Sequence, residues 1–227
     1  MLGLAERIGD YDNLNSLGSR LRRRRSAPLR RMIETVFATQ GKVSILDVGG
    51  MENYWLLFSP EFYRDNNISI TLSNLSKDIR PVERPEIFRT HTSDGCVLPY
   101  DNNQFDISHS NSVIEHVGDW SRKTAYADEV RRIAPHYFHQ TPNFWFPWEP
   151  HHGVPFYHWL PQPTQLWITR HYKMAWPTTA TDTVADGMVY VEHASMLNRP
   201  MVRHLFPDAT IIVERFAGLP KSFIALR

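Results

Sequence analysis

Short apolar runs alternate with amphipathic segments along the first 140 residues of the chain. Apolar, β-branched runs predict buried strands, whereas apolar positions spaced three and four residues apart predict helices. On this basis we expect strands at 43–48, 68–72, 86–90, 105–109 and 137–141, and helices at 51–58 and 121–133. Because strands and helices alternate, the pattern predicts a parallel, doubly wound sheet.

The last 30 residues change this pattern. A helix is expected at 194–205, followed by strands at 209–215 and 222–226. The turn Gly218-Leu219-Pro220 joins these two strands so tightly that they must pair antiparallel. The predicted fold is therefore an α/β, Rossmann-like, doubly wound sheet of seven strands. It is mostly parallel and closes with an antiparallel C-terminal hairpin.

Residues 1–40 predict a helical segment that belongs to the same domain as residues 41–227. Residues 1–13 are expected to be loosely held. Ser26-Ala27-Pro28 should interrupt a first helix, and Pro28 suits the first turn of a second helix, which Gly41 should end. The apolar positions at helical spacing are Leu14, Leu17 and Leu21 in the first helix, and Leu29, Met32, Ile33, Val36 and Phe37 in the second.

Composition narrows the classes of function. The 227 residues suffice for one sizeable α/β domain, and 25 basic against 24 acidic residues leave no global charge that selects nucleic acid. The arginine run at 20–25 is best explained as a solvated helix flank. The single Cys96 fits a reducing compartment, so a cytoplasmic location is expected. No apolar run approaches the roughly 18 residues of a membrane span, and the N-terminus lacks a signal-peptide core.

The first predicted strand ends in Asp47-Val48-Gly49-Gly50. Two glycines let the chain turn sharply and let a ligand approach the backbone. Open α/β sheets bind ligands at the carboxyl ends of their strands, so this turn marks a candidate ligand site. The stretch is not the GxGxxG dinucleotide fingerprint, which has its third glycine in the following helix.

Further motifs follow the glycine turn in a fixed order. They are Ser73-Asn74-Leu75, Asp94-Gly95-x-x-Leu98-Pro99-Tyr100 with Phe105-Asp106, Ser110-x-x-x-x-Glu115-His116-Val117, Leu205-Phe206-Pro207-Asp208-Ala209 and Gly218-Leu219-Pro220-Lys221-Ser222. Together with the glycine turn they resemble the class I S-adenosylmethionine-dependent methyltransferases, and specifically the small type 11-like group. The resemblance covers about residues 30–227.

The resemblance implies S-adenosylmethionine as cofactor and S-adenosylhomocysteine as product. Asp47 would lie near the cofactor's ammonium group or its waters. Asn74 stands where the family usually has an acid for the ribose hydroxyls, and an amide loses a charge-assisted bond there. Asp94 would accept from the adenine amino group. The implied cofactor-binding residues are Asp47, Gly49, Gly50, Asn74, Leu75, Asp94, Gly95, Ser110 and Asn111.

Ser110 and Asn111 match the turn after the fourth strand, against the sulfonium end of the cofactor. For these two residues and for Asn74, simple turn capping is the alternative interpretation. An alcohol acceptor is a poor nucleophile at pH 7, so methyl transfer to it needs a general base or a metal. Glu115-His116 and Glu149-Pro150-His151-His152 both follow predicted strands and supply candidates.

We rank His116 or His151 as the base, with Glu149 orienting it or acting in its place. The alternative for His116 is a structural role within its own helix. Glu149, His151 and His152 are adjacent and cannot easily face one ion, and the chain has no His-x-x-x-His or cysteine cluster. We therefore predict no metal-binding residues, and a divalent metal is not favoured.

Aromatic residues and prolines crowd into residues 142–177, which we expect to form a lid over the site. Flat aromatic faces suit a sugar ring or another flat ligand, although a packed cover is the alternative. The Thr141–Pro161 pattern resembles a subgroup often associated with polysaccharide synthesis, which implies O-methylation of a sugar hydroxyl. Two other hypotheses are a methyltransferase for a lipid-linked or aromatic small molecule, and a non-catalytic S-adenosylmethionine-binding module.

The expected partner is thus a glycan or a small-molecule acceptor. A nucleic acid is not expected, because no Asn-Pro-Pro-Tyr-like element follows the fourth strand. The resemblance is also compatible with a domain of a larger glycan-synthesis enzyme, and it does not predict an oligomeric state.

Overall fold

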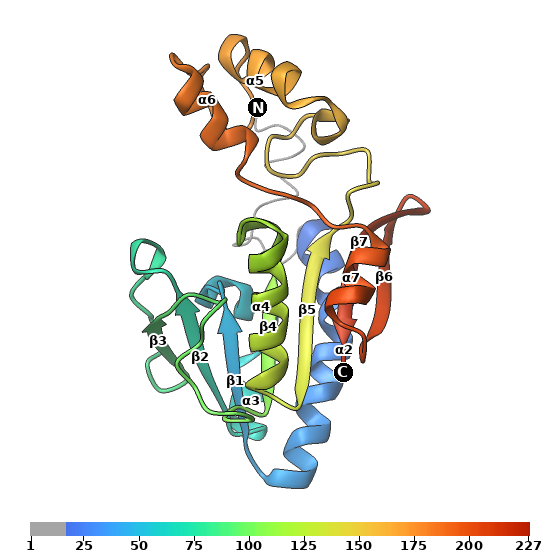
Figure 1. The fold of residues 1–227 in the computed structure, drawn as a ribbon. Coiled ribbons are helices and arrows are strands. Elements are labelled where there is room, and N and C mark those ends of the chain that lie inside the picture. The colour runs from blue at the N-terminus through green and yellow to red at the C-terminus, as the bar shows by residue number, and fades with distance from the viewer. Residues whose placement is uncertain (1–16) are drawn as a thin grey trace.

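The computed structural model describes residues 17–227, and the expectations for residues 1–13 and for Leu14 lie outside them. Seven strands form one sheet in the order β3-β2-β1-β4-β5-β7-β6 (Figure 1). β7 pairs antiparallel with both neighbours, and the other pairs are parallel, which confirms the predicted fold. The strands are β1 (Val43–Val48), β2 (Ile68–Asn74), β3 (Phe88–Thr92), β4 (Ile107–Asn111), β5 (His136–Pro142), β6 (Thr210–Phe216) and β7 (Leu219–Leu226).

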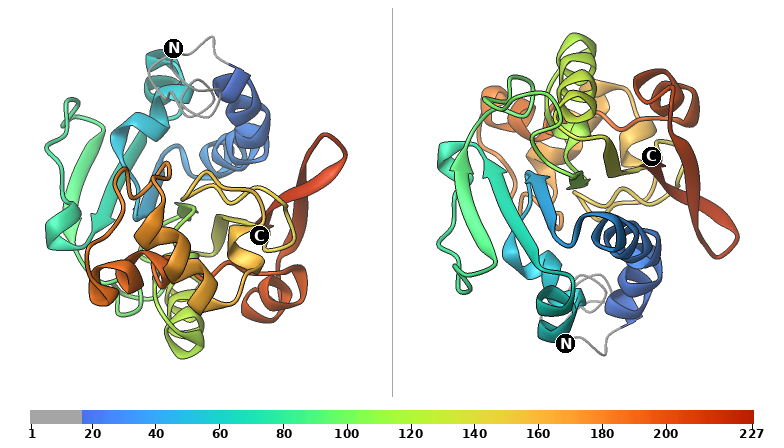
Figure 2. Two further views of the ribbon diagram at one scale, coloured as in Figure 1. Left: turned by 90° about the horizontal axis from the view of Figure 1, so that it is seen from above. Right: turned by 90° about the horizontal axis from the view of Figure 1, so that it is seen from below.

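Helices cover both faces of the sheet, and each face has its own hydrophobic cluster (Figure 2). On one face Leu29 and Ile33 pack beside the strands, and on the other Tyr126 and Leu205 do so. Burying each such side chain contributes about 1.5–3 kcal/mol. The helices are α2 (Leu17–Gln40), the 3-10 helix η1 (Glu52–Leu57) and α3 (Pro60–Asp65) on the first face, and α4 (Trp120–Arg132) and α7 (Arg199–Leu205) on the second.

Helix α2 continues through Pro28, so the predicted break at 26–28 is wrong. A proline inside a helix removes one backbone hydrogen bond. Two features offset that loss. Ser26 Oγ donates to the Arg23 carbonyl at 3.0 Å, and the fully buried Leu29 anchors the following turn. Gly41, at φ +70°, ends the helix as predicted.

Strand β4 begins and ends two residues later than predicted, and so does β3. Asp106, expected inside β4, instead precedes it and connects the start of β4 to β1 by hydrogen bonds. Its carboxylate accepts from the backbone N–H of Ser44 at 2.8 Å and from the Ser44 hydroxyl at 2.7 Å. The turn after β4 therefore falls at Ser112, at φ +58°, and Ser110 and Asn111 are strand residues.

The helix predicted at 194–205 is helical only over α7. The Asn198 side chain accepts from the backbone N–H of Met201 at 3.1 Å and caps the helix there. Residues 194–197 are not helical, and Leu197 bridges to Asn143 beside the end of β5.

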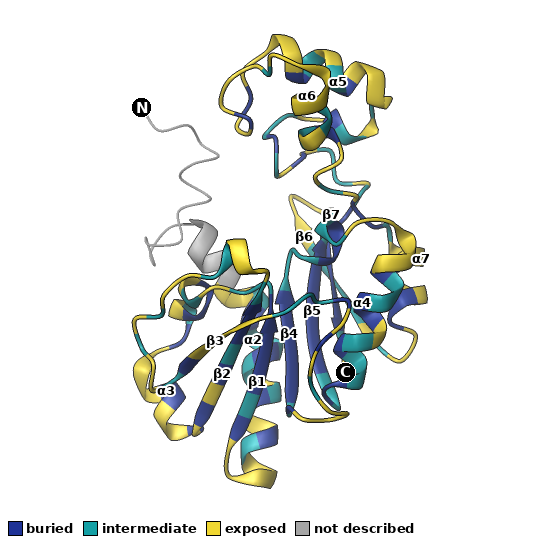
Figure 3. Ribbon diagram, turned by 60° about the vertical axis from the view of Figure 1, so that its left-hand side comes forward, coloured by how far each residue is buried: buried dark blue, intermediate teal, exposed yellow. Residues whose placement is uncertain are grey.

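Residues 143–198 leave the sheet after β5 and form a separate layer, here called the cap, above the carboxyl ends of the strands (Figure 1). The backbone N–H of Phe144 donates to the Leu197 carbonyl at 2.9 Å, so the two ends of the cap lie side by side. Figure 3 shows mostly exposed and half-buried residues in the cap, whereas the central strands β1, β4 and β5 are mostly buried. The cap contains the 3-10 helix η4 (Tyr157–Trp159), α5 (Gln162–His171) and α6 (Val184–Val191).

The sequence pattern predicted neither α5 nor α6. The buried positions of α5 are the polar Gln165 and Thr169, so α5 has no apolar face to recognise, and α6 has only eight residues. The expected lid at 142–177 covers only the first part of the cap. Among the described residues, no helix is both long and apolar enough to cross a membrane.

Candidate active site

Two cavities lie at the carboxyl ends of the strands, and residues 191–196 contribute to the walls of both. The first, here called the sheet cavity, has a volume of about 520 Å³. It lies beside β1, β2 and β4, at the point where the strand order reverses and where open α/β sheets bind ligands. The predicted site residues that line it are Gly49, Asn74, Leu75, Asp94, Gly95 and His116.

Asp47 lies beneath the glycine turn and not in the wall of the sheet cavity. Its carboxylate is fully buried, 2.6 Å from Nδ1 of His109, and accepts from the indole N–H of Trp55 at 2.7 Å. A Cβ at Gly50 would lie 1.8 Å from this carboxylate, and Gly49 has φ +72°. Both positions therefore require glycine, and Asp47 fixes the turn whose backbone faces the cavity.

Asn74 also holds the glycine turn. Its side-chain N–H donates to the Gly50 carbonyl at 2.8 Å, and this leaves the amide oxygen for a ligand. The neighbouring Leu75 is 47% exposed at the cavity wall. An aspartate at position 74 could not donate this bond, which gives the amide a structural reason.

Asp94 and Gly95 lie at the far side of the sheet cavity. The Asp94 carboxylate accepts from Arg122 at 2.8 Å and from the backbone N–H of Cys96 at 2.9 Å. These hydrogen bonds hold the pKa of Asp94 below its ordinary value. A Cβ at Gly95 would lie 2.9 Å from the Tyr126 ring and from Val48, so close packing on the core requires glycine here.

Ser110 and Asn111 are not among the described residues that line either cavity. Ser110 is buried in the sheet, and its hydroxyl lies 2.9 Å from Nδ1 of His139. The next two residues, Ser112 and Val113, line the sheet cavity in their place. Sequence reasoning missed them because it placed the end of β4 two residues too early.

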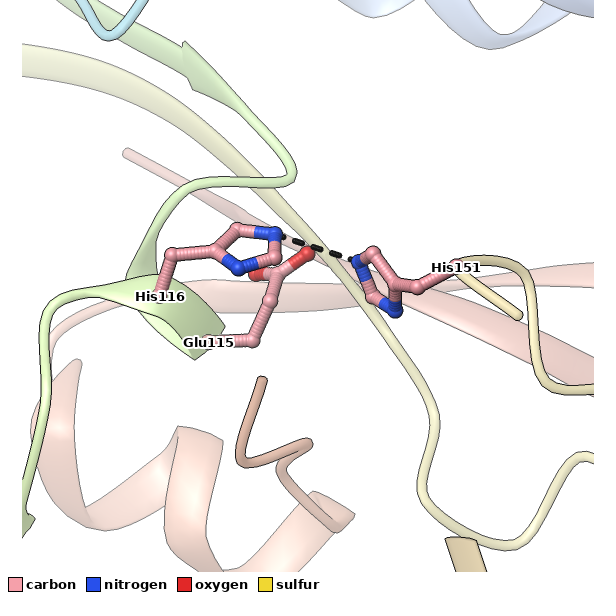
Figure 4. Close-up of side chains that lie close together, drawn as sticks. All are labelled: Glu115, His116 and His151. Carbon is pink, nitrogen blue, oxygen red and sulfur yellow. Dashed lines mark hydrogen bonds between the residues drawn. The ribbon is translucent and has the colours of Figure 1, made fainter. Parts of the chain in front are cut away.

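The three predicted catalytic residues form one hydrogen-bonded row between the cavities. Nε2 of His151 lies 3.1 Å from Nε2 of His116 (Figure 4), and Nδ1 of His151 lies 2.6 Å from the Glu149 carboxylate. His116 ends the 3-10 helix η3 (Ile114–His116) and lines the sheet cavity. Glu149 lines the second cavity, so the row spans from one cavity to the other.

Hydrogen-bond partners fix the protons of the two imidazoles. Nδ1 of His116 lies 2.9 Å from the His193 carbonyl, which can only accept, as can the Glu149 carboxylate. Both Nδ1 atoms therefore carry a proton, and one further proton lies between the two Nε2 atoms. We assign it to His151, which donates to a neutral His116.

The electrostatics agree with this assignment. Burial lowers the pKa of His116 to about 4. Burial also opposes the charged form of His151, but the hydrogen bond and charge of Glu149 outweigh it and raise the pKa of His151. For Glu149, burial raises the pKa, but its hydrogen bond with His151 leaves the net pKa lowered.

Glu115 is a further member of the site, which the sequence analysis named beside His116 but did not rank as a catalytic residue. It is fully buried, and one carboxylate oxygen accepts from the Thr141 hydroxyl at 2.9 Å. The other oxygen, Oε1, has no hydrogen-bond partner within residues 17–227. Burial raises the pKa of Glu115 to about 7, against the opposing charges of His151 and Lys123.

The second cavity, here called the cap cavity, has a volume of about 610 Å³ and lies between the cap and the core. Its walls combine aromatic faces with polar side chains. The principal lining side chains are Phe144, Glu149, His152, Tyr157, Gln162, Gln165, Glu192 and Met196. Sequence reasoning anticipated the aromatic residues but not the two glutamines, which lie on α5.

The sequence matches no protein family model and no curated protein. A solved S-adenosylmethionine-dependent methyltransferase from Methanosarcina mazei is similar, with a TM-score of 0.54 at 14% identity over 82% of this chain and 92% of that one. The 1,6-didemethyltoxoflavin N1-methyltransferase of Burkholderia thailandensis, solved with S-adenosylhomocysteine, has a TM-score of 0.48 at 13% identity. That match covers 89% of this chain and 78% of the other. The chain has the fold of the class I S-adenosylmethionine-dependent methyltransferases, and these similarities identify no acceptor.

Proposed function

We propose that this protein is an S-adenosylmethionine-dependent methyltransferase that O-methylates a sugar hydroxyl of a glycan, by in-line displacement with a general base. The observation that carries the proposal is the row formed by Glu149, His151 and His116. It joins the sheet cavity, located where this fold binds ligands, to the cap cavity. A methyl donor in the first cavity and an acceptor in the second would meet at the two histidines.

The residues of the sheet cavity fit the cofactor. When bound, the cofactor supplies a methyl group on a positively charged sulfur, which needs no further activation. Gly49 and Gly95 both line this cavity, at two points where a side chain would clash with its neighbours. The free amide oxygen of Asn74 suits a ribose hydroxyl, and the Asp94 carboxylate suits the adenine amino group.

His151 is the proposed base. The histidine pair first releases the proton between its two Nε2 atoms. An acceptor hydroxyl then donates its proton to Nε2 of His151, and the Glu149 carboxylate stabilises the imidazolium that forms. His116 stays neutral, because its one proton is held on Nδ1 by the His193 carbonyl.

The lining of the cap cavity supports a sugar as acceptor. The half-buried Phe144 offers an aromatic face to the C–H side of a sugar ring, and the exposed Gln162 offers an amide to its hydroxyls. The likeness to the polysaccharide-associated subgroup points to the same class.

The test is turnover with S-adenosylmethionine and a panel of deoxysugar glycosides, on protein treated with EDTA. We expect release of S-adenosylhomocysteine and a product heavier by one methylene group for at least one glycoside. His151→Ala should lower turnover about a hundredfold or more and leave the affinity for S-adenosylhomocysteine unchanged. His171→Ala, which removes an exposed imidazole at the end of α5, is the matched control and should retain turnover.

The other outcomes separate the competing hypotheses. Turnover only with an apolar acceptor would replace the sugar by a hydrophobic small molecule. Cofactor binding without turnover on any acceptor would favour a non-catalytic module. Unchanged turnover in His151→Ala would remove His151 from the mechanism.

A further inference from the structure

Three potential metal ligands converge where the cap meets the core. Glu115 and His116 come from η3, at the end of β4, and His151 comes from the cap. One ligand atom of each residue lies within 4.8 Å of the ligand atoms of the other two. Figure 4 shows both imidazoles directed toward each other, with the Glu115 carboxylate beside their contact.

Each imidazole is held from behind at Nδ1, so that Nε2 is presented to the partner ring. A carboxylate, that of Glu149, holds His151, and a backbone carbonyl, that of His193, holds His116. These are the two kinds of acceptor that commonly orient metal-binding histidines and fix their tautomer. Once the proton between the rings is removed, two Nε2 lone pairs face one point.

The distance between the two nitrogens suits a shared ion. They lie 3.1 Å apart, and two imidazole nitrogens can both lie about 2.1 Å from one ion at that separation. A second observation, independent of the two histidines, comes from the buried carboxylate of Glu115. Its side chain is 1% exposed, and its Oε1 has no partner in the described part of the chain. An unpartnered buried carboxylate oxygen is costly, and a cation beside it removes that cost.

We infer that Glu115, His116 and His151 form a binding site for one divalent transition-metal ion of the Zn²⁺, Co²⁺ or Fe²⁺ type. Two imidazoles and one carboxylate favour these ions over Mg²⁺ and Ca²⁺, which prefer oxygen ligands. Three protein ligands leave coordination positions for water or an acceptor oxygen. His116 lines the sheet cavity, which gives an ion a route from solvent.

The inferred site departs from the sequence prediction of no metal ligands. The sequence prediction considered only neighbours in the chain, namely Glu149, His151 and His152, which cannot easily face one ion. The fold instead brings His151 to Glu115 and to His116, which is 35 positions away. A bound ion takes the Nε2 lone pairs that the proposed base needs. Metal binding and base catalysis therefore exclude each other, and this consequence alone rests on the proposed function.

The test is direct metal binding to the full chain after EDTA treatment and desalting. We expect titration with Co²⁺ to give visible absorption bands that saturate at one ion per chain, and Zn²⁺ to abolish them by competition. Mg²⁺ at the same concentration should leave the bands unchanged. Glu115→Gln should weaken Co²⁺ binding more than about tenfold, and His116→Ala and His151→Ala should remove the saturating bands.

The matched control is His193→Ala. The His193 ring lies 4.4 Å from the His116 ring, centroid to centroid, but its backbone carbonyl is the group that holds His116. We therefore expect Co²⁺ affinity within about threefold of wild type. Thermal unfolding with and without Zn²⁺ provides a second measurement, because an ion that binds the folded state raises the unfolding temperature of wild type and not of His116→Ala.

Absence of saturable Co²⁺ or Zn²⁺ binding by wild type would overturn the inference, as would equal binding by wild type and a folded His116→Ala, His151→Ala double variant. Methyl transfer in EDTA without any metal binding would overturn the metal site and leave the proposed function standing. Metal binding, together with no methyl transfer to any acceptor by the EDTA-treated protein, would overturn the proposed function and leave the metal site standing.

Discussion

The sheet core and the cap are stabilised in different ways. In the core, strand residues such as Ile45 and Leu46 are fully buried, and their backbone is paired on both sides. In the cap, Trp145 and Trp167 remain 62% and 52% exposed, and polar side chains line a cavity. The difference indicates that the core carries most of the stability. In the proposed function, the cap supplies His151 and Glu149.

The largest expected effect is that of removing the cap, which should abolish most turnover and leave folding and cofactor binding in place. Residues 146–195 can be replaced by a short Gly-Ser linker, because Phe144 and Leu197 are already joined by a 2.9 Å backbone hydrogen bond. We expect the shortened chain to unfold cooperatively and to bind S-adenosylhomocysteine within about tenfold of wild type. Its turnover should fall at least about a hundredfold, since both His151 and Glu149 are lost.

Calorimetry and a turnover assay measure these effects, with His151→Ala in the intact chain as the control for loss of the base alone. Loss of cooperative unfolding in the shortened chain would contradict the division between core and cap.

Paired truncations should show where the stability resides. Leu46→Ala, in the middle of β1, should lower the free energy of unfolding by about 2–5 kcal/mol, because the cavity it leaves is lined by packed side chains. Trp167→Ala, on the exposed side of α5, should change the free energy of unfolding by about 0.5 kcal/mol or less. Denaturant titration measures both, and equal losses would be inconsistent with a core that dominates stability.

The pH dependence of turnover should report the histidine pair at the boundary between the two regions. The pair acts after losing its shared proton, and the pKa of His151 is raised above its ordinary value of 6.5 by Glu149, against the effect of burial. In the presence of EDTA, kcat/KM should therefore rise with pH through an apparent pKa above 6.5 and then level off. Glu149→Gln should shift this profile to lower pH and reduce its plateau about tenfold or more.

The opposite slope, with activity falling as the pH rises through this range, would contradict the base assignment. An unshifted profile in Glu149→Gln would remove Glu149 from its role on His151.

The smallest expected effect is that of a substitution at Asn74, in the core. Asn74→Asp introduces the acid that the resemblance to class I methyltransferases implies at this position, but it places a carboxylate 2.8 Å from the Gly50 carbonyl. We expect the affinity for S-adenosylhomocysteine to fall by about tenfold or less, because the lost hydrogen bond loosens the glycine turn. A gain in affinity would show that the amide has no structural role there.

Sequence patterns predicted the core better than the site, for physical reasons. Strands such as β1 and β2 are set by local apolar runs, which the chain shows directly. The burial of Asp47 depends on Trp55 and His109, which only the folded sheet brings together. Contacts of this kind leave no pattern in the local sequence and therefore could not be predicted from it.

The row of catalytic candidates shows the same limit. His116, His151 and Glu149 could be proposed one by one, from their places after predicted strands. Their mutual contacts, and the unpartnered oxygen of Glu115 beside them, depend on the path of the cap. That path could not be predicted because α5 buries polar residues and α6 has only eight residues.

The central claim is that the sheet cavity binds S-adenosylmethionine, and calorimetric titration with S-adenosylhomocysteine tests it most directly. Wild type should bind one molecule per chain. Asp94→Ala should bind tenfold to a hundredfold more weakly, as expected for loss of a hydrogen bond to a charged group, about 1.5–3 kcal/mol. Asp128→Ala, which removes an exposed carboxylate on α4, should bind as wild type does. Failure of wild type to bind, or equal binding by Asp94→Ala, would contradict the account.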